Sequence, residues 1–156
     1  MEKYDKLAIR AEKIKYYPFS LSHDLRILYA LSGSIILRFV AGEYVLNEGE
    51  VEIININEPV MITGYNADNM ILCFEIDGTA AKEYCDIINK GIFNCNTTLF
   101  YASVTDKNSQ DILKNKLRIA YSYYLADVSD LVIENTTKDL VRFIGDNCHD
   151  MRNMFK

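Results

Sequence analysis

The stretch that decides the fold is residues 25–56, LRILYALSGSIILRFVAGEYVLNEGEVEIINI, in which short apolar runs alternate with turn residues. The runs are rich in β-branched and aromatic residues, and Gly, Asn, Asp or Pro follows each of them. The predicted strands are residues 25–31, 34–40, 43–46, 51–56 and 70–76. Short strands at such close spacing predict an antiparallel barrel or sandwich, not a parallel sheet with crossover helices.

The segments on either side of these strands have different patterns. Upstream, residues 6–19 fit either a helix or one or two edge strands, and Pro18 favours an extended end. Downstream of Asp77 and Gly78 the apolar period becomes helical. The predicted helices are residues 79–90, closed by Gly91, a longer helix from near Asn108, and a last helix from near Thr136 or Thr137.

We therefore expect a single domain over residues 1–156, mainly β and then α. A barrel over about 1–78 is followed by a connecting helix and strand over about 79–105, with a strand-like run at 98–102. A helical pair over about 106–156 completes the domain.

Composition narrows the class of protein. The chain has 156 residues, 49% of them hydrophobic, and a formal net charge of −5 with scattered Lys and Arg, which disfavours nucleic-acid binding. The four cysteines have no CxxC spacing, the amino terminus has no signal-peptide core, and no apolar run approaches the roughly 20 residues that cross a bilayer. We expect a cytoplasmic protein with reduced thiols and no membrane partner.

Residues 27–33, 42–50 and 53–59 resemble the cupin superfamily, in particular the amino-terminal domain of AraC-type transcription regulators. In that family these segments are a strand ending in leucine and a turn glycine, a G-x-x-Y-x-L-x-x-G-D hairpin, and a strand with I-N-x-N-E. The resemblance continues into the helices and covers most of the chain. It implies a cupin-like barrel, a double-stranded β-helix with C-terminal helices packed on it. The physical pattern agrees, because Gly33, Gly42 and Gly49 lie between apolar runs, where tight turns require positive φ.

The positions that hold metal ligands in cupins are occupied by other types of residue in this chain. Arg26 stands where the family has a glutamate, and Val60 stands where it has a histidine. Only His23 and His149 are present, whereas a divalent ion needs three or four converging ligands. We expect no metal and no other cofactor. Signatures of acyl transfer, phosphate binding and dinucleotide binding are also missing, so we assign no catalytic residue and expect a protein that is not an enzyme.

Arg26 is the most informative candidate. In the cupin register it points into the barrel with Leu28 and Ala30, because strand side chains alternate between faces. A buried guanidinium needs a partner, which is either an anionic ligand, an internal acid such as Glu75, or water at the barrel mouth. The candidate ligand-binding residues are His23, Arg26, Leu28, Arg38, Asn55, Val60 and Ile62.

Several of these positions also fit a purely structural role. His23 fits a surface turn, and Asn55 and Asn57 fit ordinary turn positions. The aromatic residues that fit either a ligand wall or a plain core are Tyr16, Tyr17, Phe19, Tyr29 and Tyr44. The glutamates interpreted as solvated hairpin charges are Glu48, Glu50, Glu52 and Glu58.

The long helix is the candidate dimer interface, since paired helices after the barrel commonly form that interface in AraC-type regulators. The predicted dimer contacts are Leu113, Leu117, Tyr121 and Tyr124. Tyr123 lies off this stripe, which suggests that the helix is buried against two surfaces. In the last helix, the predicted apolar face is Leu140, Ile144, Cys148 and Met151.

The resemblance implies an effector-sensing and dimerisation domain. An anionic or sugar-like small molecule in the barrel would bias the helices and so reorient DNA-binding units. The family carries two helix-turn-helix units after this region, and none fits before Lys156, so we expect a truncated piece or a stand-alone sensor. The alternatives are a metal-free sugar isomerase or epimerase, which needs a His or Tyr acid/base pair in the barrel, and a structural dimerisation module with a filled barrel. A roomy polar cavity favours sensing, and a packed interior favours the structural role.

Overall fold

Two four-stranded antiparallel sheets form the barrel in the computed structural model, which describes residues 3–40, 42–93 and 107–148. The first sheet has the order β1 (Leu7–Glu12), β8 (Met70–Ile76), β3 (Leu25–Ser32), β6 (Val51–Ile54). The second has the order β2 (Tyr16–Ser20), β7 (Val60–Gly64), β4 (Ile35–Phe39), β5 (Gly42–Leu46). Eight strands arranged in two sheets with such long-range pairings are a jelly roll, the architecture of cupins. The predicted cupin-like barrel followed by helices is confirmed.

Two parts of the barrel differ from the strand prediction. Residues 6–19, which fitted either a helix or edge strands, form the edge strands β1 and β2 of the two sheets. Strand β7 was not predicted, because its five residues begin directly after Pro59 and end at a glycine. It is nevertheless central, since it pairs with β2 on one side and β4 on the other. Cross-strand pairing, not local pattern, determines this element.

The helices are α1 (Gly78–Tyr84), α2 (Lys107–Leu125) and α3 (Asp130–Asn147). Helix α1 is shorter than the predicted 79–90, because Cys85 already has extended backbone. Helix α3 starts earlier than predicted, at a cap in which the Ser129 side chain accepts from Val132 N. Thr136 and Thr137 lie inside α3, where each hydroxyl donates to the carbonyl four residues back.

Some predictions lie outside the described residues, namely the strand-like run 98–102 and Met151. Of the helices described, none is both long enough and apolar enough to cross a bilayer.

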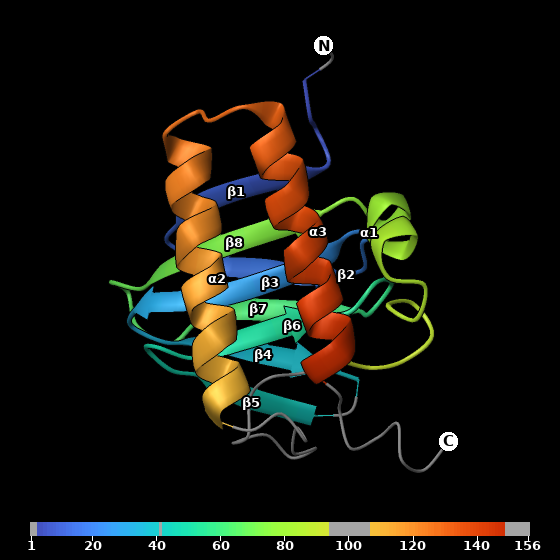
Figure 1. Cartoon of the computed structure of the whole chain (residues 1–156). Helices are drawn as coiled ribbons and strands as arrows, with labels where there is room; N and C mark the ends of the chain where they lie inside the picture. Colours follow the sequence, from blue (N-terminus) through green and yellow to red (C-terminus); the bar gives the residue numbers. More distant parts are fainter. Residues whose placement is uncertain (1–2, 41, 94–106, 149–156) are drawn as a thin grey trace.

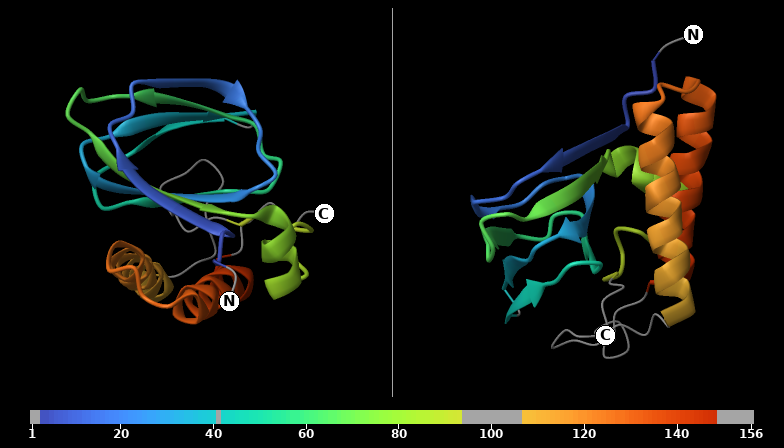
Figure 2. Two further views of the ribbon diagram at one scale, coloured as in Figure 1. Left: turned by 90° about the horizontal axis from the view of Figure 1, so that it is seen from above. Right: turned by 90° about the vertical axis from the view of Figure 1, so that its left-hand side faces the viewer.

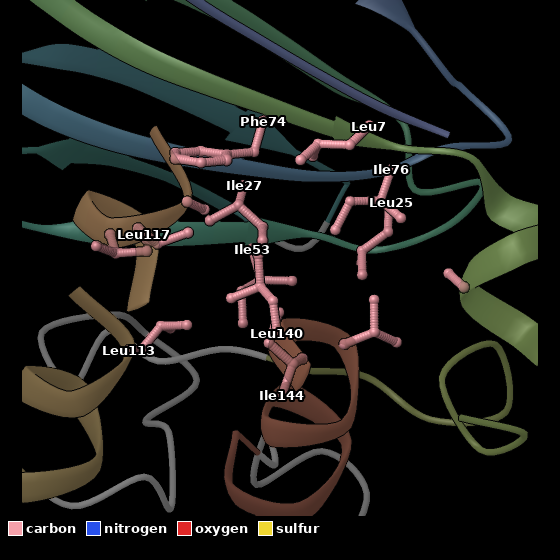
Figure 3. Close-up of a cluster of buried hydrophobic side chains, with 14 of the residues drawn as sticks. Leu7, Leu25, Ile27, Ile53, Phe74, Ile76, Leu113, Leu117, Leu140 and Ile144 are labelled. Carbon is pink, nitrogen blue, oxygen red and sulfur yellow. The ribbon is translucent and has the colours of Figure 1, made fainter. Parts of the chain in front are cut away.

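The first sheet has an apolar core on each face. Helices α2 and α3 cover its outer face (Figures 1 and 2), and there Ile27 and Phe74 of the sheet meet Leu117 and Leu140 of the helices (Figure 3). The inner face meets the second sheet, through the side chains of Leu28, Ala30, Leu37, Ile62 and Cys73. Because neighbouring residues of β3 alternate between these two cores, this strand links the barrel interior to the helices.

The predicted tight turns are confirmed at Gly33 and Gly49, which have φ of 68° and 84°. Gly33 is required for a second reason, since a Cβ there would lie 2.7 Å from Asn69 Cα. Gly42 is the first residue of β5.

Candidate functional site

A cavity of about 140 Å³ lies inside the barrel, lined by residues of both sheets. Its apolar lining comes from Ile14, Leu28, Ile54, Val60, Ile62, Pro18 and Phe74. Its polar lining comes from Arg10, Glu12, Tyr17, Ser20, Arg26, Cys73 and Glu75. Arg10, Tyr17 and Ser20 are exposed, so the cavity is open to solvent along the edge strands β1 and β2. A cavity of roughly this size holds a benzene-sized molecule.

Four predicted ligand-binding residues come together in this cavity. Arg26 and Leu28 lie on the inner face of β3, as strand alternation predicted, and Val60 and Ile62 face them from β7. The packed-barrel alternative is thus disfavoured, because free space remains beside these side chains.

Three other predicted ligand-binding residues lie elsewhere, and the prediction for them is corrected. Arg38 is exposed on the outer face of β4, where its Nη2 lies 2.5 Å from Glu43 Oε2. The inner face of that strand is taken by the buried side chains of Ile35, Leu37 and Phe39. His23 is exposed ahead of β3 and does not line the cavity.

Asn55 is buried, but it stabilises a loop and does not line the cavity. Its Oδ1 accepts from Phe93 N at 2.8 Å, and its Nδ2 donates to Phe93 O at 3.2 Å and to Glu58 Oε1 at 2.9 Å. The amide thus satisfies both backbone groups of a buried residue 38 positions away.

Arg10 and Glu12 are site residues that the sequence analysis missed. Arg10 Nη1 lies 2.5 Å from Glu75 Oε1, and Arg10 Nε lies 3.2 Å from Glu12 Oε2. The hydroxyl of Tyr17 donates to Glu12 Oε1 at 2.9 Å. Burial opposes the charge of Arg10, yet its bonds to Glu75 raise its pKa. The R-x-E spacing would have placed both side chains on one face, had residues 7–12 been predicted as a strand.

Arg26 does not form the ion pair with Glu75 that the sequence suggested. It lies directly opposite Glu75 in the β3–β8 register, but Glu75 is bonded to Arg10. Arg26 Nη2 donates to Glu58 O at 3.4 Å, and Arg26 Nε is buried with no hydrogen-bond partner among the described residues. Burial lowers the pKa of Arg26, in spite of the nearby carboxylates of Glu75, Asp24 and Glu58. The cavity therefore contains an under-satisfied cation.

Cys73 is the thiol of the cavity, and it is a poor nucleophile. Burial and the charge of Glu12 raise its pKa to about 12, and its Sγ lies 3.6 Å from Glu12 Oε1. Since the thiolate is the reactive form, this cysteine is inert near neutral pH.

Glu52 is a further residue whose predicted position was wrong. It was interpreted as a solvated hairpin charge, but it is only 2% exposed, on the inner face of β6 opposite Leu28. Alternation explains this burial, because Val51 and Ile53 on the same strand pack toward the helices.

The cavity does not fit the metal that many cupins hold. Within the described ranges, no group of three or more His, Cys, Asp or Glu side chains could hold a metal ion. Arg26 and Val60 instead place a cation and an alkyl group on the cavity wall.

The predicted dimer contacts on α2 also need correction. Leu113 and Leu117 are fully buried against the chain's own barrel, and Tyr121 packs partly against the same core. Tyr124 is 39% exposed near the end of the helix. The apolar residues exposed along a different face of α2 are Ile112, Ile119 and Tyr123, so burial of this helix against a second surface stays a prediction.

No protein-family model matches this sequence, and no curated protein matches it. Among solved structures, a Neisseria meningitidis protein is 15% identical, with 49% of this chain and 87% of that chain covered and a TM-score of 0.42. A cupin-2 domain protein from Shewanella frigidimarina is 13% identical, with 48% and 74% covered and a TM-score of 0.43. A DMSP lyase from Ruegeria pomeroyi is 21% identical, with 46% and 39% covered and a TM-score of 0.41. These likenesses concern about half of this chain, and the fold assignment rests on the strand order above.

Proposed function

We propose that this chain is a ligand-sensing domain whose barrel cavity binds a small molecule and whose helices respond to it. The observation that carries the proposal is Arg26, which lines an open cavity and whose buried Nε has no partner among the described residues. An unpaired buried donor costs about 1–3 kcal/mol, and an oxygen atom of a ligand would remove that penalty. The other charged groups of the cavity wall are already paired with one another.

Strand β3 would relay binding to the helices. Arg26 and Leu28 line the cavity, whereas Tyr29 points to α2, and its hydroxyl accepts from Arg118 Nη2 at 2.5 Å. A ligand that binds more tightly to one conformation of β3 would shift the equilibrium between two positions of α2. The size of that shift equals the difference in binding free energy between the two conformations. The family resemblance supports a transcription regulator, in which helix-turn-helix units outside residues 1–156 would contact DNA.

Two copies would pair through the helices in this proposal. The exposed stripe of Ile112, Ile119 and Tyr123 offers the apolar surface for such a contact, on the side of α2 that does not pack on the barrel. In the part of the chain that the structure describes, Cys73 and Cys85 form no disulfide, which fits a cytoplasmic location, where thiols stay reduced.

Binding is favoured over catalysis by the chemistry of the cavity. No histidine among the described residues lines it, so the acid/base pair of a sugar isomerase would have to use carboxylates that Arg10 already engages. The raised pKa of Cys73 also disfavours a thiolate nucleophile.

A panel of small molecules tests the proposal. Thermal unfolding would be measured with acetate, 3-methylbutanoate, benzoate, glycerol and glucose, for the wild type, Ile62→Phe and Arg38→Met. Ile62→Phe fills the cavity, whereas Arg38→Met changes an arginine on the outside of the same barrel.

We expect at least one compound to raise the Tm of the wild type and of Arg38→Met, but not that of Ile62→Phe. Amide hydrogen exchange over 107–125 should then slow with the compound bound. If no compound stabilises the wild type, the proposal fails, and a higher Tm of Ile62→Phe would then indicate a structural module.

A further inference from the structure

We propose that the ligand of the barrel cavity is a small apolar monocarboxylate whose carboxylate binds one edge of the Arg26 guanidinium. This inference rests on the proposed function and specifies the chemical class of ligand that the cavity takes.

The carboxylate end is assigned from the hydrogen bonds of Arg26. Its Nε has no partner among the described residues, and the bond that its Nη2 donates to Glu58 O is 3.4 Å, long for N–H···O. Nε and Nη2 form the edge of a guanidinium that pairs with both oxygens of a carboxylate. A carboxylate bound at two points would therefore satisfy the unpartnered Nε and improve on the long bond of Nη2.

The carboxylates near Arg26 do not fill this site, because each has other partners. Glu75 is bonded to Arg10, and Glu58 accepts from the backbone and side-chain nitrogens of Asn55 at 3.0 and 2.9 Å. The carboxylate of Asp24 accepts a hydrogen bond from the backbone of Gly78. Burial lowers the pKa of Arg26 although these groups are near, so they do not fully compensate its desolvation. An anion brought by the ligand would supply the missing compensation.

The apolar end is assigned from the opposite wall. Leu28, Val60 and Ile62 are all buried, and they present alkyl groups to a cavity of about 140 Å³. A space of roughly this size takes one ring or a short branched chain. Burying such a body without polar atoms gains stability from the hydrophobic effect.

A second carboxylate on the ligand is disfavoured by charge. Glu12 and Glu75 line the same cavity, and both share Arg10 as their cation. A dicarboxylate would place its second charge near these glutamates, and the described part of the chain offers no unpaired cation on that side. The cavity should thus distinguish one carboxylate from two on the same carbon skeleton.

Three compounds with nearly the same skeleton test the inference, namely 3-methylbutanoate, 3-methylbutanamide and 3-methylpentanedioate. Their dissociation constants would be measured by calorimetric titration for the wild type, Arg26→Met, Arg26→Lys and Arg38→Met. We expect 3-methylbutanoate to bind the wild type and Arg38→Met about tenfold more tightly than the other two compounds, since a charge-assisted bidentate pair is at stake. Arg26→Met should remove this preference, and Arg26→Lys, which keeps the charge but not the fork, should retain only part of it.

Circular dichroism and Tm establish that each variant is folded, so a loss of binding cannot be mistaken for unfolding. Equal binding of the acid and the amide to the wild type, or an unchanged preference in Arg26→Met, would overturn the carboxylate assignment. If glucose or glycerol stabilises the wild type but not Ile62→Phe while 3-methylbutanoate has no effect, the ligand class is wrong and the sensing proposal stands. Absence of any cavity-dependent stabilisation overturns both.

Discussion

Arg10 on β1 is bonded to Glu75 on β8, with 2.5 Å between Nη1 and Oε1, although the two residues are not opposite each other in the sheet. On the other side of β8, the residue opposite Glu75 is Arg26 of β3. Two arginines thus lie near one carboxylate, and it is Arg10 that forms the ion pair. Arg10 is the more exposed of the two, and it also reaches Glu12, so its charge is the better compensated. Arg26 remains inside the barrel with an unsatisfied donor, and the proposed ligand binding depends on this arrangement.

Substitution of Arg26 tests whether this arginine is a structural or a binding residue. Arg26→Met keeps most of the side-chain volume and removes a partly buried, under-satisfied cation, so we expect the free energy of unfolding to rise by about 1 kcal/mol. Urea denaturation of the ligand-free protein measures this change. Arg38→Met is the control, since loss of its exposed ion pair should change stability by no more than about 0.5–1 kcal/mol. A large loss of stability in Arg26→Met would show that Arg26 is paired internally.

Alkylation of Cys73 should be slow in the folded protein. Its pKa, raised from 9.0 to about 12, lowers the thiolate fraction at pH 8 by about a thousandfold relative to the unfolded chain. Iodoacetamide labelling of Cys73 at pH 8, followed by mass spectrometry in the absence and presence of urea, measures the difference. Rapid labelling of Cys73 in the folded protein would contradict the raised pKa of its thiol.

The same shift predicts a dependence of stability on pH. Above about pH 9 the unfolded chain loses the thiol proton while the folded chain keeps it, so the Cys73 contribution should fall as pH rises from 9 toward 12. Urea denaturation of the wild type and Cys73→Ala over this range tests the sign, because the variant should lose less stability than the wild type as pH rises. An equal decline in both proteins would exclude the cysteine as a cause.

Asn55 is predicted to matter for stability and not for binding. Asn55→Ala would remove the two hydrogen bonds that Asn55 makes with the buried N–H and C=O of Phe93, at an expected cost of about 2–3 kcal/mol in urea denaturation. Its neighbour Asn57 is a matched control, because it is exposed with φ of 62°, where Asn57→Gly should be neutral or slightly stabilising. A weakened affinity for 3-methylbutanoate in a folded Asn55→Ala protein would restore Asn55 as a ligand-binding candidate.

The sequence predicts the position of a site residue where polar and apolar residues alternate clearly along a strand. It does not predict that position where the direction of a side chain depends on which strands pair. In β3 the single charged residue faces the cavity, and Arg26 was correctly placed inside. In β4 the pattern IILRF has apolar residues at both parities, and only pairing with β5 and β7 turns Arg38 outward. Strand β1, LAIRAE, has no strong local pattern and depends on β8, so Arg10 and Glu12 could not be found before the sheet was known.

We predict self-association through the exposed apolar stripe of α2, which consists of Ile112, Ile119 and Tyr123. The leucines first predicted as dimer contacts are buried within the chain. Ile119 is 42% exposed at the centre of this stripe, so Ile119→Glu should leave the fold intact and place a charge in the proposed contact. We expect the wild type to sediment as a dimer at micromolar concentration and Ile119→Glu to dissociate at least about tenfold more readily. Leu21→Glu is the control, since Leu21 is 57% exposed but precedes β3 on the barrel. A wild type that sediments as a monomer, or equal dissociation of the two variants, would exclude α2 as the interface.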